Sequence, residues 1–302
     1  MRASDVLLTS TSLKWKSRRK TSFLPDLAIE KGTASILLGA KESGHRHVID
    51  CILGLGSLKE GEVIVCGEKW TPKTNRNIGC ALRPRVFIDH LTIKDNLQRH
   101  RRLSMFEEKD IDEVLEEFGL AENSGARVYS LSDSMKQRLN LARAAMGSPQ
   151  LLVLEDPFSD LDEIWRKKLH AWIEKSLGNG VGILMSTHQP EDVQKFGNDI
   201  IIFDKGKVIE RGDGRLLDPN VKRIAIRCDS AISTATLMQK EPEVINATVH
   251  SPDYLTIHIL DKNVEWVRNT LKKGNQTYSS CQNIPSNLER LFPPQRYENA
   301  DK

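Results

Sequence analysis

The sequence lacks any long hydrophobic run. Its longest apolar stretches, such as residues 151–154 and 200–203, fall far short of the about 20 residues that a membrane-spanning helix needs. We therefore expect no transmembrane helix. The first 12 residues also lack a basic segment followed by an apolar core, so no secretory signal is expected.

Cysteine is scarce, with 5 residues in 302, and none of them forms a C-x-x-C pair. This pattern favours reduced thiols in the cytosol and disfavours both a disulfide framework and a zinc site. Net charge is also small, because 44 lysines and arginines face 41 aspartates and glutamates, which leaves +3. Such a balance disfavours bulk electrostatic capture of nucleic acid, so no nucleic-acid partner is expected.

The residues that are present belong to a folded chain of about two domains, with 39% hydrophobic and 28% charged residues. Short apolar runs alternate with helical patterns up to about residue 215, which predicts an α/β fold with a parallel-rich sheet. A segment rich in Gly, Asp and Pro at residues 212–220 marks a boundary. Residues 220–302 read as a small α+β module, for which a ferredoxin-like arrangement is the candidate.

The first segment with a chemical pattern joins an apolar strand to a helical pattern and reads GAKESGHR. A phosphate-binding loop reads G-x-x-x-x-G-K-[ST]: its backbone N–H groups surround phosphates, its Lys reaches the β- and γ-phosphates, and its hydroxyl ligates Mg²⁺. Gly39 and Gly44 keep the glycines, but His45 replaces the Lys and Arg46 replaces the hydroxyl residue. Taken alone, the segment fits an ordinary strand–turn–helix connection better than a phosphate loop.

Further along the chain, other segments follow in a recognisable order. Residues 78–97 include Arg83, residues 131–135 read LSDSM, residues 151–157 read LLVLEDP, and residues 159–162 read SDLD. With the loop in view, the sequence resembles the ATP-binding subunits of ABC transporters over about residues 4–215. In that family these segments correspond to the Q-loop, the LSGGQ signature, Walker B with its two acids exchanged, and the D-loop. The order of the motifs carries the resemblance.

The resemblance implies a P-loop NTPase (ABC ATPase) fold for residues 1–215, with a helical subdomain over about residues 90–147, and an accessory domain at residues 220–302. It also implies site residues by position. The nucleotide-binding candidates are Trp15 (adenine stacking), Gly39, Lys41, Gly44, His45, Arg46 and Arg83. The catalytic candidates are Glu155, Asp156 and the switch residue His188; Asp162 is the D-loop acid, and Ser132, Asp133 and Ser134 form the signature loop that faces a partner.

Several of these residues also have simpler interpretations. Trp15 fits an edge aromatic, and Ser132 fits a helix N-cap. The two acids fit the end of a strand, Asp162 fits a solvated turn, and His188 fits a core histidine. Basic runs at residues 14–20 and 99–102 fit solvated faces, with contact to a membrane subunit or anionic lipid as the functional alternative.

Physical chemistry predicts that the departures from the family pattern weaken the site. An unperturbed imidazole is mostly neutral at pH 7, so His45 cannot supply the field of a Lys. A guanidinium has no acceptor, so Arg46 cannot ligate a cation, and Arg83 removes another oxygen. A normal Mg²⁺ site is therefore not expected, with Glu155 the one candidate contact. ATP remains the expected cofactor, since Arg46, Arg83 and Lys41 could hold its phosphates directly.

The exchanged acids and the altered signature also predict a weakened catalytic site. Moving each carboxylate by one methylene matters, because geometry errors near 1 Å can cost ~10²-fold in rate. Asp133 and Ser134 replace the glycines that allow close approach to phosphate, and Asp133 adds negative charge. Neither of the two composite sites of a family dimer would then be fully equipped.

The sequence therefore predicts an ATP-binding subunit of an ABC-type membrane exporter, with weak or absent hydrolysis and a structural or regulatory role. The resemblance implies integral-membrane permease subunits and a second ATP-binding subunit as partners, and a location at the cytoplasmic face of the membrane. Residues 284–292 resemble the appended segment of the drug, antibiotic and sodium export branch. Two alternatives remain: a slow but active ABC ATPase, and a soluble ABC-family protein acting on nucleic acid or ribosomes.

Overall fold

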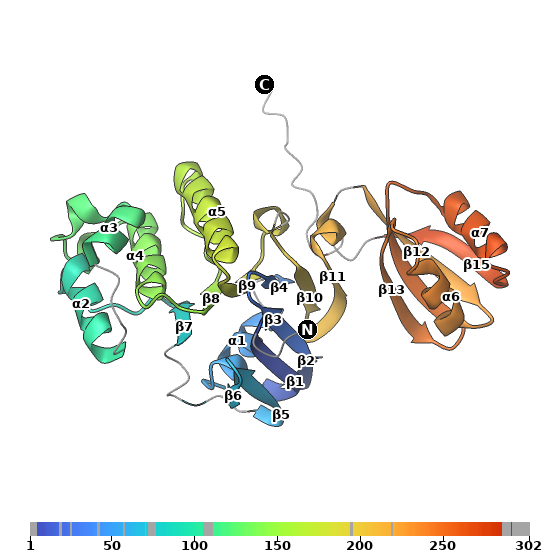
Figure 1. Ribbon diagram of the computed structural model, residues 1–302, viewed down its shortest axis with the longest axis horizontal. Coiled ribbons are helices and arrows are strands. Elements are labelled where there is room, and N and C mark those ends of the chain that lie inside the picture. The colour runs from blue at the N-terminus through green and yellow to red at the C-terminus, as the bar shows by residue number, and fades with distance from the viewer. Residues whose placement is uncertain are drawn as a thin grey trace, which may run out of the picture. The chain divides into compact units, whose positions relative to one another are not determined.

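The computed structural model describes residues 5–17, 20–24, 26–40, 43–56, 58–69, 71, 77–104, 111–193, 196–218, 220–285 and 291. Its contacts divide the chain into two compact units (Figure 1). The first holds residues 1–188 and 203–208, and the second holds residues 189–202 and 209–302. No helix within the described ranges is both long and apolar enough to cross a membrane.

An eleven-stranded sheet, most of it in the first unit, has the order β6-β5-β1-β2-β11-β10-β4-β9-β8-β7, with β3 paired to β1. The strands are β1 (Val6–Ser17), β2 (Lys20–Leu24), β3 (Leu27–Glu30), β4 (Ala34–Gly39), β5 (Leu58–Val65), β6 (Glu68–Lys69), β7 (Ile78–Ala81), β8 (Leu151–Glu155), β9 (Gly182–Thr187), β10 (Asp199–Asp204) and β11 (Lys207–Gly212). Residues 203–208 of the β10–β11 hairpin belong to this unit.

The parallel part of this sheet carries the candidate motifs. Strand β8 pairs in parallel with β7 and β9, and β9 pairs in parallel with β4. Every residue of β4, β8 and β9 is buried, as the continuous apolar runs predict for strands covered on both faces. Because parallel strands end at one edge of the sheet, the loops that follow β4, β8 and β9 lie together there.

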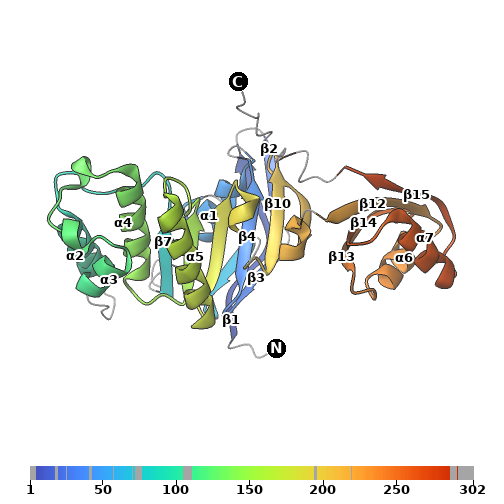
Figure 2. The same cartoon turned by 90° about the horizontal axis from the view of Figure 1, so that it is seen from above.

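Helices cover the sheet and form a separate group beside it. They are α1 (His45–Ile52), α2 (Ile93–Ser104), α3 (Ile111–Glu117), α4 (Asp133–Ala145) and α5 (Glu163–Gly178), with short 3-10 turns at Ala121–Asn123 and Val128–Ser130. Helices α2, α3 and α4 gather beyond β7 (Figures 1 and 2). The helix α4 packs on β7, so this group is joined to the sheet near the Arg83 segment.

The second unit contains a small α+β module with the order β12 (Val221–Cys228), α6 (Ala231–Met238), β13 (Val244–Ser251), β14 (Tyr254–Leu260), α7 (Val264–Lys273) and β15 (Tyr278–Ile284). Its four strands are arranged β13-β14-β12-β15, and all pairs are antiparallel. A β-α-β-β-α-β chain of this kind is ferredoxin-like. Its core includes Ile224, Ile226, Leu255, Ile257 and Val267.

Packing of β7 against α4 gives a prediction about Gly79. A Cβ added there would lie 2.1 Å from the backbone oxygen of Ala144 and 2.9 Å from the Leu152 side chain. The variant Gly79→Ala should therefore lose about 1–3 kcal/mol of unfolding free energy, the usual cost of overpacking. Denaturant unfolding measures it. Gly125→Ala is the matched control, since nothing lies within 4 Å of its added Cβ; equal stability of the two variants would contradict the packing.

Candidate functional site

The candidate site lies at the carboxyl edge of the parallel strands. Gly39 ends β4, Glu155 ends β8, and His188 directly follows β9. The pairing register aligns Glu155 with Ser186. The strand register therefore brings the phosphate-loop, Walker B and switch positions of the sequence analysis to one place.

Both glycines of the loop lie where an added Cβ would meet close neighbours. A Cβ on Gly39 would lie 2.2 Å from the Ser43 hydroxyl oxygen. Gly44 has φ 97°, a left-handed conformation, and a Cβ there would lie 3.0 Å from the Cα atom of Gly206. The Gly206 N–H donates to the Ser43 carbonyl at 2.6 Å. Lys41, a predicted phosphate contact, lies outside the described residues.

His45 is turned into the protein. Its side chain is buried, and its Nδ1 lies 2.6 Å from the Ser43 Oγ. Burial lowers the pKa of His45 to about 4, and the nearby Arg46 and His188 charges add to this, although Asp156 opposes it. The imidazole is therefore neutral at pH 7 and supplies no cation at the position where the family has its Lys.

The guanidinium of Arg46 lies on Glu155. Arg46 Nη1 donates to Glu155 Oε1 at 2.6 Å and also to the Arg83 carbonyl oxygen. The Arg83 backbone N–H donates to the other carboxylate oxygen, Glu155 Oε2, at 2.8 Å. Burial raises the pKa of Glu155, while the Arg83 hydrogen bond and the Arg46 charge oppose that rise. Three motifs distant in the sequence are thus joined by one buried carboxylate.

The residues do not fit the Mg²⁺ that the fold family implies. Mg²⁺ takes oxygen ligands in octahedral geometry. Glu155, the one carboxylate considered for it, already accepts on both oxygens, and Arg46 offers no acceptor. No group of three His, Cys, Asp or Glu side chains in the described part of the chain could hold a metal ion.

The second acid pairs with the switch histidine. Asp156 Oδ1 lies 2.8 Å from His188 Nδ1, and the Asp156 N–H donates to the Ser186 carbonyl at 2.9 Å. Asp156 has φ 45°, which turns its side chain out of the strand direction. The strand register and this contact therefore bring the two catalytic candidates Asp156 and His188 together.

An ion-pair network that the sequence analysis missed extends from Arg83. Arg83 Nη2 lies 2.7 Å from Asp160 Oδ2, and Arg85 Nη2 lies 2.8 Å from the same oxygen. Burial works against ionisation of Asp160, but the two guanidiniums lower its pKa below the usual range. Arg85 also donates to the Asp133 carbonyl at 2.8 Å. Asp160 lies inside the D-loop segment 159–162 and Arg85 lies two residues after Arg83, but nothing in the sequence indicated that they would pair.

The remaining predicted residues take local structural roles in the described chain. The Ser132 hydroxyl accepts from the Met135 N–H at 3.2 Å and caps α4, and the Asp162 carboxylate accepts from the Trp165 N–H at 2.9 Å and caps α5. Asp133 is exposed, and Ser134 is partly buried. Trp15 lies on β1 opposite Ser22 and Leu58, and its side chain is not among those described.

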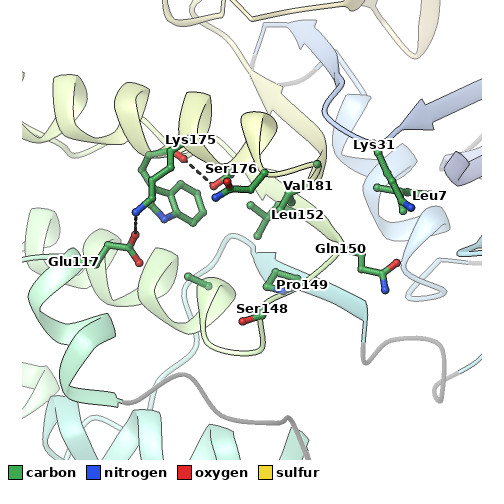
Figure 3. Close-up of a pocket in the computed structure, with 14 residues that line it drawn as sticks. Leu7, Lys31, Glu117, Ser148, Pro149, Gln150, Leu152, Lys175, Ser176 and Val181 are labelled. Atoms are coloured by element: carbon green, nitrogen blue, oxygen red, sulfur yellow. Dashed lines mark hydrogen bonds and ion pairs between the residues drawn. The ribbon is translucent and has the colours of Figure 1, made fainter. Parts of the chain in front are cut away.

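A separate cavity of about 500 Å³ lies at the opposite edge of the sheet (Figure 3). It is lined by residues at the start of β8, such as Gln150, and at the end of α5, such as Lys175. Lys175 pairs with Glu117 at 3.9 Å. None of the predicted site residues lines this cavity, so it is distinct from the candidate nucleotide site.

The parallel sheet, its glycine loop and the acids that follow β8 define a nucleotide-binding domain of the P-loop NTPase class. A model of the family described as ABC transporter matches residues 25–159. The chain contains an ATP-binding domain of the ABC transporter family.

Curated relatives include two proteins named as transport ATP-binding proteins. The chain is 25% identical over 261 residues to the bacitracin transport ATP-binding protein BcrA of Bacillus licheniformis, covering 84% of this chain and 85% of that protein. It is 29% identical over 184 residues to the lantibiotic transport ATP-binding protein SrtF of Streptococcus pyogenes, covering 61% of this chain and 80% of that protein. The first match extends into the C-terminal module, because it is longer than the ATP-binding fold.

Solved structures share the fold. An ATP-binding subunit of an ABC transporter superposes with a TM-score of 0.63 at 23% identity, covering 68% of this chain and 90% of that one. A bacterial Atm1-family ABC exporter with ATP bound gives a TM-score of 0.61 at 15% identity, covering 71% of this chain and 40% of that one. The expected P-loop NTPase fold is therefore confirmed.

Burial of His45 gives a prediction about acid stability. Its pKa falls from 6.5 to about 4 on folding, so the unfolded chain binds more protons between these values and stability falls as pH falls through that window. The variant His45→Asn keeps a polar group for Ser43. Between pH 7 and pH 5, its unfolding free energy should fall by about 2 kcal/mol less than that of the wild type.

Denaturant unfolding at the two pH values measures this difference. His100 on α2 also has a pKa lowered to about 4 by burial, but it is present in both proteins and cancels in the comparison. An identical pH dependence in the two proteins would show that His45 is not held neutral.

Proposed function

We propose that this chain is the ATP-binding subunit of an ABC-type membrane exporter and that it has lost most or all of its ATPase activity. Its role is structural or regulatory, and a second ATP-binding chain carries the hydrolysis. The observation that supports this most strongly is the Arg46–Glu155 ion pair, which occupies the carboxylate beside the phosphate loop. Without a metal at that carboxylate, the developing charge of phosphoryl transfer loses a principal source of stabilisation.

Two further observations support loss of hydrolysis. His45 is buried and neutral, so it cannot stabilise charge on a γ-phosphate as a Lys would. Arg83, in place of the Q-loop Gln, is directed to Asp160 and is not available as an oxygen ligand. On the partner side, Ser132 is engaged as the N-cap of α4, and Asp133 would bring a carboxylate toward the phosphates of a neighbouring subunit.

The proposed assembly follows from the relatives. The bacitracin and lantibiotic proteins are named as transport ATP-binding proteins, and subunits of this kind work with membrane permease components. We infer that residues 1–215 act as the ATP-binding domain, residues 220–302 act as an accessory domain, and the complex lies at the cytoplasmic face of a membrane. Trp15, Gly39, Lys41 and Gly44 remain the proposed contacts of the nucleotide.

ATPase measurement separates the inactive subunit from the slow ATPase. The purified full chain with Mg²⁺ and ATP should release no more phosphate than the variant Glu155→Gln/Asp156→Asn. Restoring the loop with His45→Lys and Arg46→Ser should increase turnover, because it returns the γ-phosphate cation and the metal ligand. Robust wild-type turnover that Arg46→Ala abolishes would instead establish an active ATPase that uses Arg46.

Co-purification separates the exporter subunit from a protein acting on nucleic acid or ribosomes. The affinity-tagged full chain, extracted in mild detergent from its native cells, should carry an integral-membrane protein. Treatment with nuclease should leave the yield of the tagged chain and its partners unchanged, because nucleic acid does not hold the proposed complex together. Recovery of ribosomes or nucleic acid in place of a membrane protein would contradict the exporter assignment.

A further inference from the structure

The Arg46 guanidinium is hydrogen-bonded through one terminal nitrogen, while its other terminal nitrogen has no partner in the described part of the chain. Its Nη1 is fixed by Glu155 and the Arg83 carbonyl, and its Nε lies 3.7 Å from Asp50. The Nη2 atom has no hydrogen-bond partner among the described residues, and 42% of the side chain is exposed. Arg46 is the second residue of α1, two positions after Gly44, so it belongs to the phosphate-loop region.

We propose that Arg46 is a built-in cation that replaces Mg²⁺, so that this chain binds nucleoside triphosphate in its metal-free form. The proposal rests on the proposed function, because it assumes that the site still takes ATP. It adds the chemical form of the ligand: the free polyphosphate anion, bound equally well with or without divalent cation.

Charge balance supports this form of the ligand. In a metal-dependent site, Mg²⁺ stands between phosphate oxygens and protein carboxylates. A guanidinium can stand in the same place, since it forms parallel N–H bonds to a carboxylate with one edge and to a phosphate with another. Here the carboxylate contact is one hydrogen bond, at 2.6 Å between Arg46 Nη1 and Glu155 Oε1, and the other carboxylate oxygen accepts from the Arg83 N–H. The phosphate side then needs no further cation.

The surroundings of Arg46 fix it in this place. Arg83 holds both members of the pair through its backbone, with its carbonyl on the guanidinium and its N–H on Glu155. The Arg83 side chain is directed away to Asp160 at 2.7 Å, so it does not compete for Glu155. Glu155 is only 6% exposed, so a divalent ion would have to displace Arg46 from a buried carboxylate.

Arg46 is the charged side chain in the described part of the loop. Among the described residues from Gly39 to Arg46, only Arg46 carries a side chain charged at pH 7, because His45 is buried and neutral. Asp156, the other acid near His45, is engaged with His188 at 2.8 Å. Within the described residues, a metal-free phosphate group would meet the oriented Arg46 cation, and Mg²⁺ would find Glu155 and Asp156 already engaged with partners.

Equilibrium binding of ATP to the purified full chain tests the proposal. Calorimetric titrations are made in EDTA and in Mg²⁺, with wild type, Arg46→Ser, Arg46→Lys and the exposed control Arg102→Ser. Wild type should bind ATP with affinities that agree within about threefold in the two buffers. Arg46→Ser should bind about tenfold to a hundredfold more weakly in EDTA, because a charge-assisted contact to phosphate is lost, and should recover part of the affinity in Mg²⁺.

The other variants keep the test decisive. Arg46→Lys retains the positive charge but not the planar set of guanidinium donors, so its affinity for ATP in EDTA should lie between those of wild type and Arg46→Ser. The affinity of Arg102→Ser should match that of wild type. Thermal unfolding confirms that each variant is folded; if Arg46→Ser is not, Arg46→Lys and the wild-type comparison decide. Three results would overturn the proposal: wild-type binding strengthened tenfold or more by Mg²⁺, no ATP binding in either buffer, or equal binding by folded Arg46→Ser and wild type in EDTA.

These outcomes differ from failure of the proposed function. ATP binding that Mg²⁺ strengthens, without turnover, would contradict the role of Arg46 as a replacement for Mg²⁺. It would be consistent with the proposed inactive subunit. Mg²⁺-dependent hydrolysis by the wild-type chain would instead contradict the loss of ATPase activity, whatever the affinities are.

Discussion

The ion pair between Arg46 and Glu155 is the interaction on which the rest of the site depends. Glu155 ends a fully buried strand, and a carboxylate in that position needs a partner because water cannot reach it freely. In a metal-dependent site a hydrated cation helps to meet that need. Here the guanidinium meets it from within the chain, at 2.6 Å, and the backbone of Arg83 completes it. The same pair therefore satisfies the buried carboxylate, and in our proposal it keeps a divalent ion away.

A second set of charges is balanced in the same way. Asp160 lies between Arg83 and Arg85, and Arg85 also holds the backbone of the signature segment at Asp133. Segments that follow β7 and β8 are thus tied to the start of α4 by side chains of this chain alone. Two acids of this unit, Glu155 and Asp160, each meet an arginine. These ion pairs are therefore formed without a bound nucleotide or metal.

The sequence predicted the scaffold better than the chemistry. The apolar runs of β4, β8 and β9 suited buried strands, as the structure has them, and the parallel order of these strands places Gly39, Glu155 and His188 at one edge. Residue types also predicted that Arg46 could not ligate a metal. They did not predict that Arg46 would reach Glu155, 109 positions away, or that Asp160 would join two arginines, because rotamers and long-range contacts decide both. In the second unit, the burial of Glu210 against His258 is another long-range contact that the sequence pattern does not predict.

The central claim is that a guanidinium stands where the family holds a metal ion. A crystal structure of the full chain grown with ATP and Mn²⁺, with anomalous scattering data recorded for manganese, examines that position directly. The account predicts the Arg46 guanidinium between Glu155 and the phosphates, with no anomalous peak at the site. A manganese peak bound to Glu155 and the phosphates, with Arg46 turned away, would contradict it.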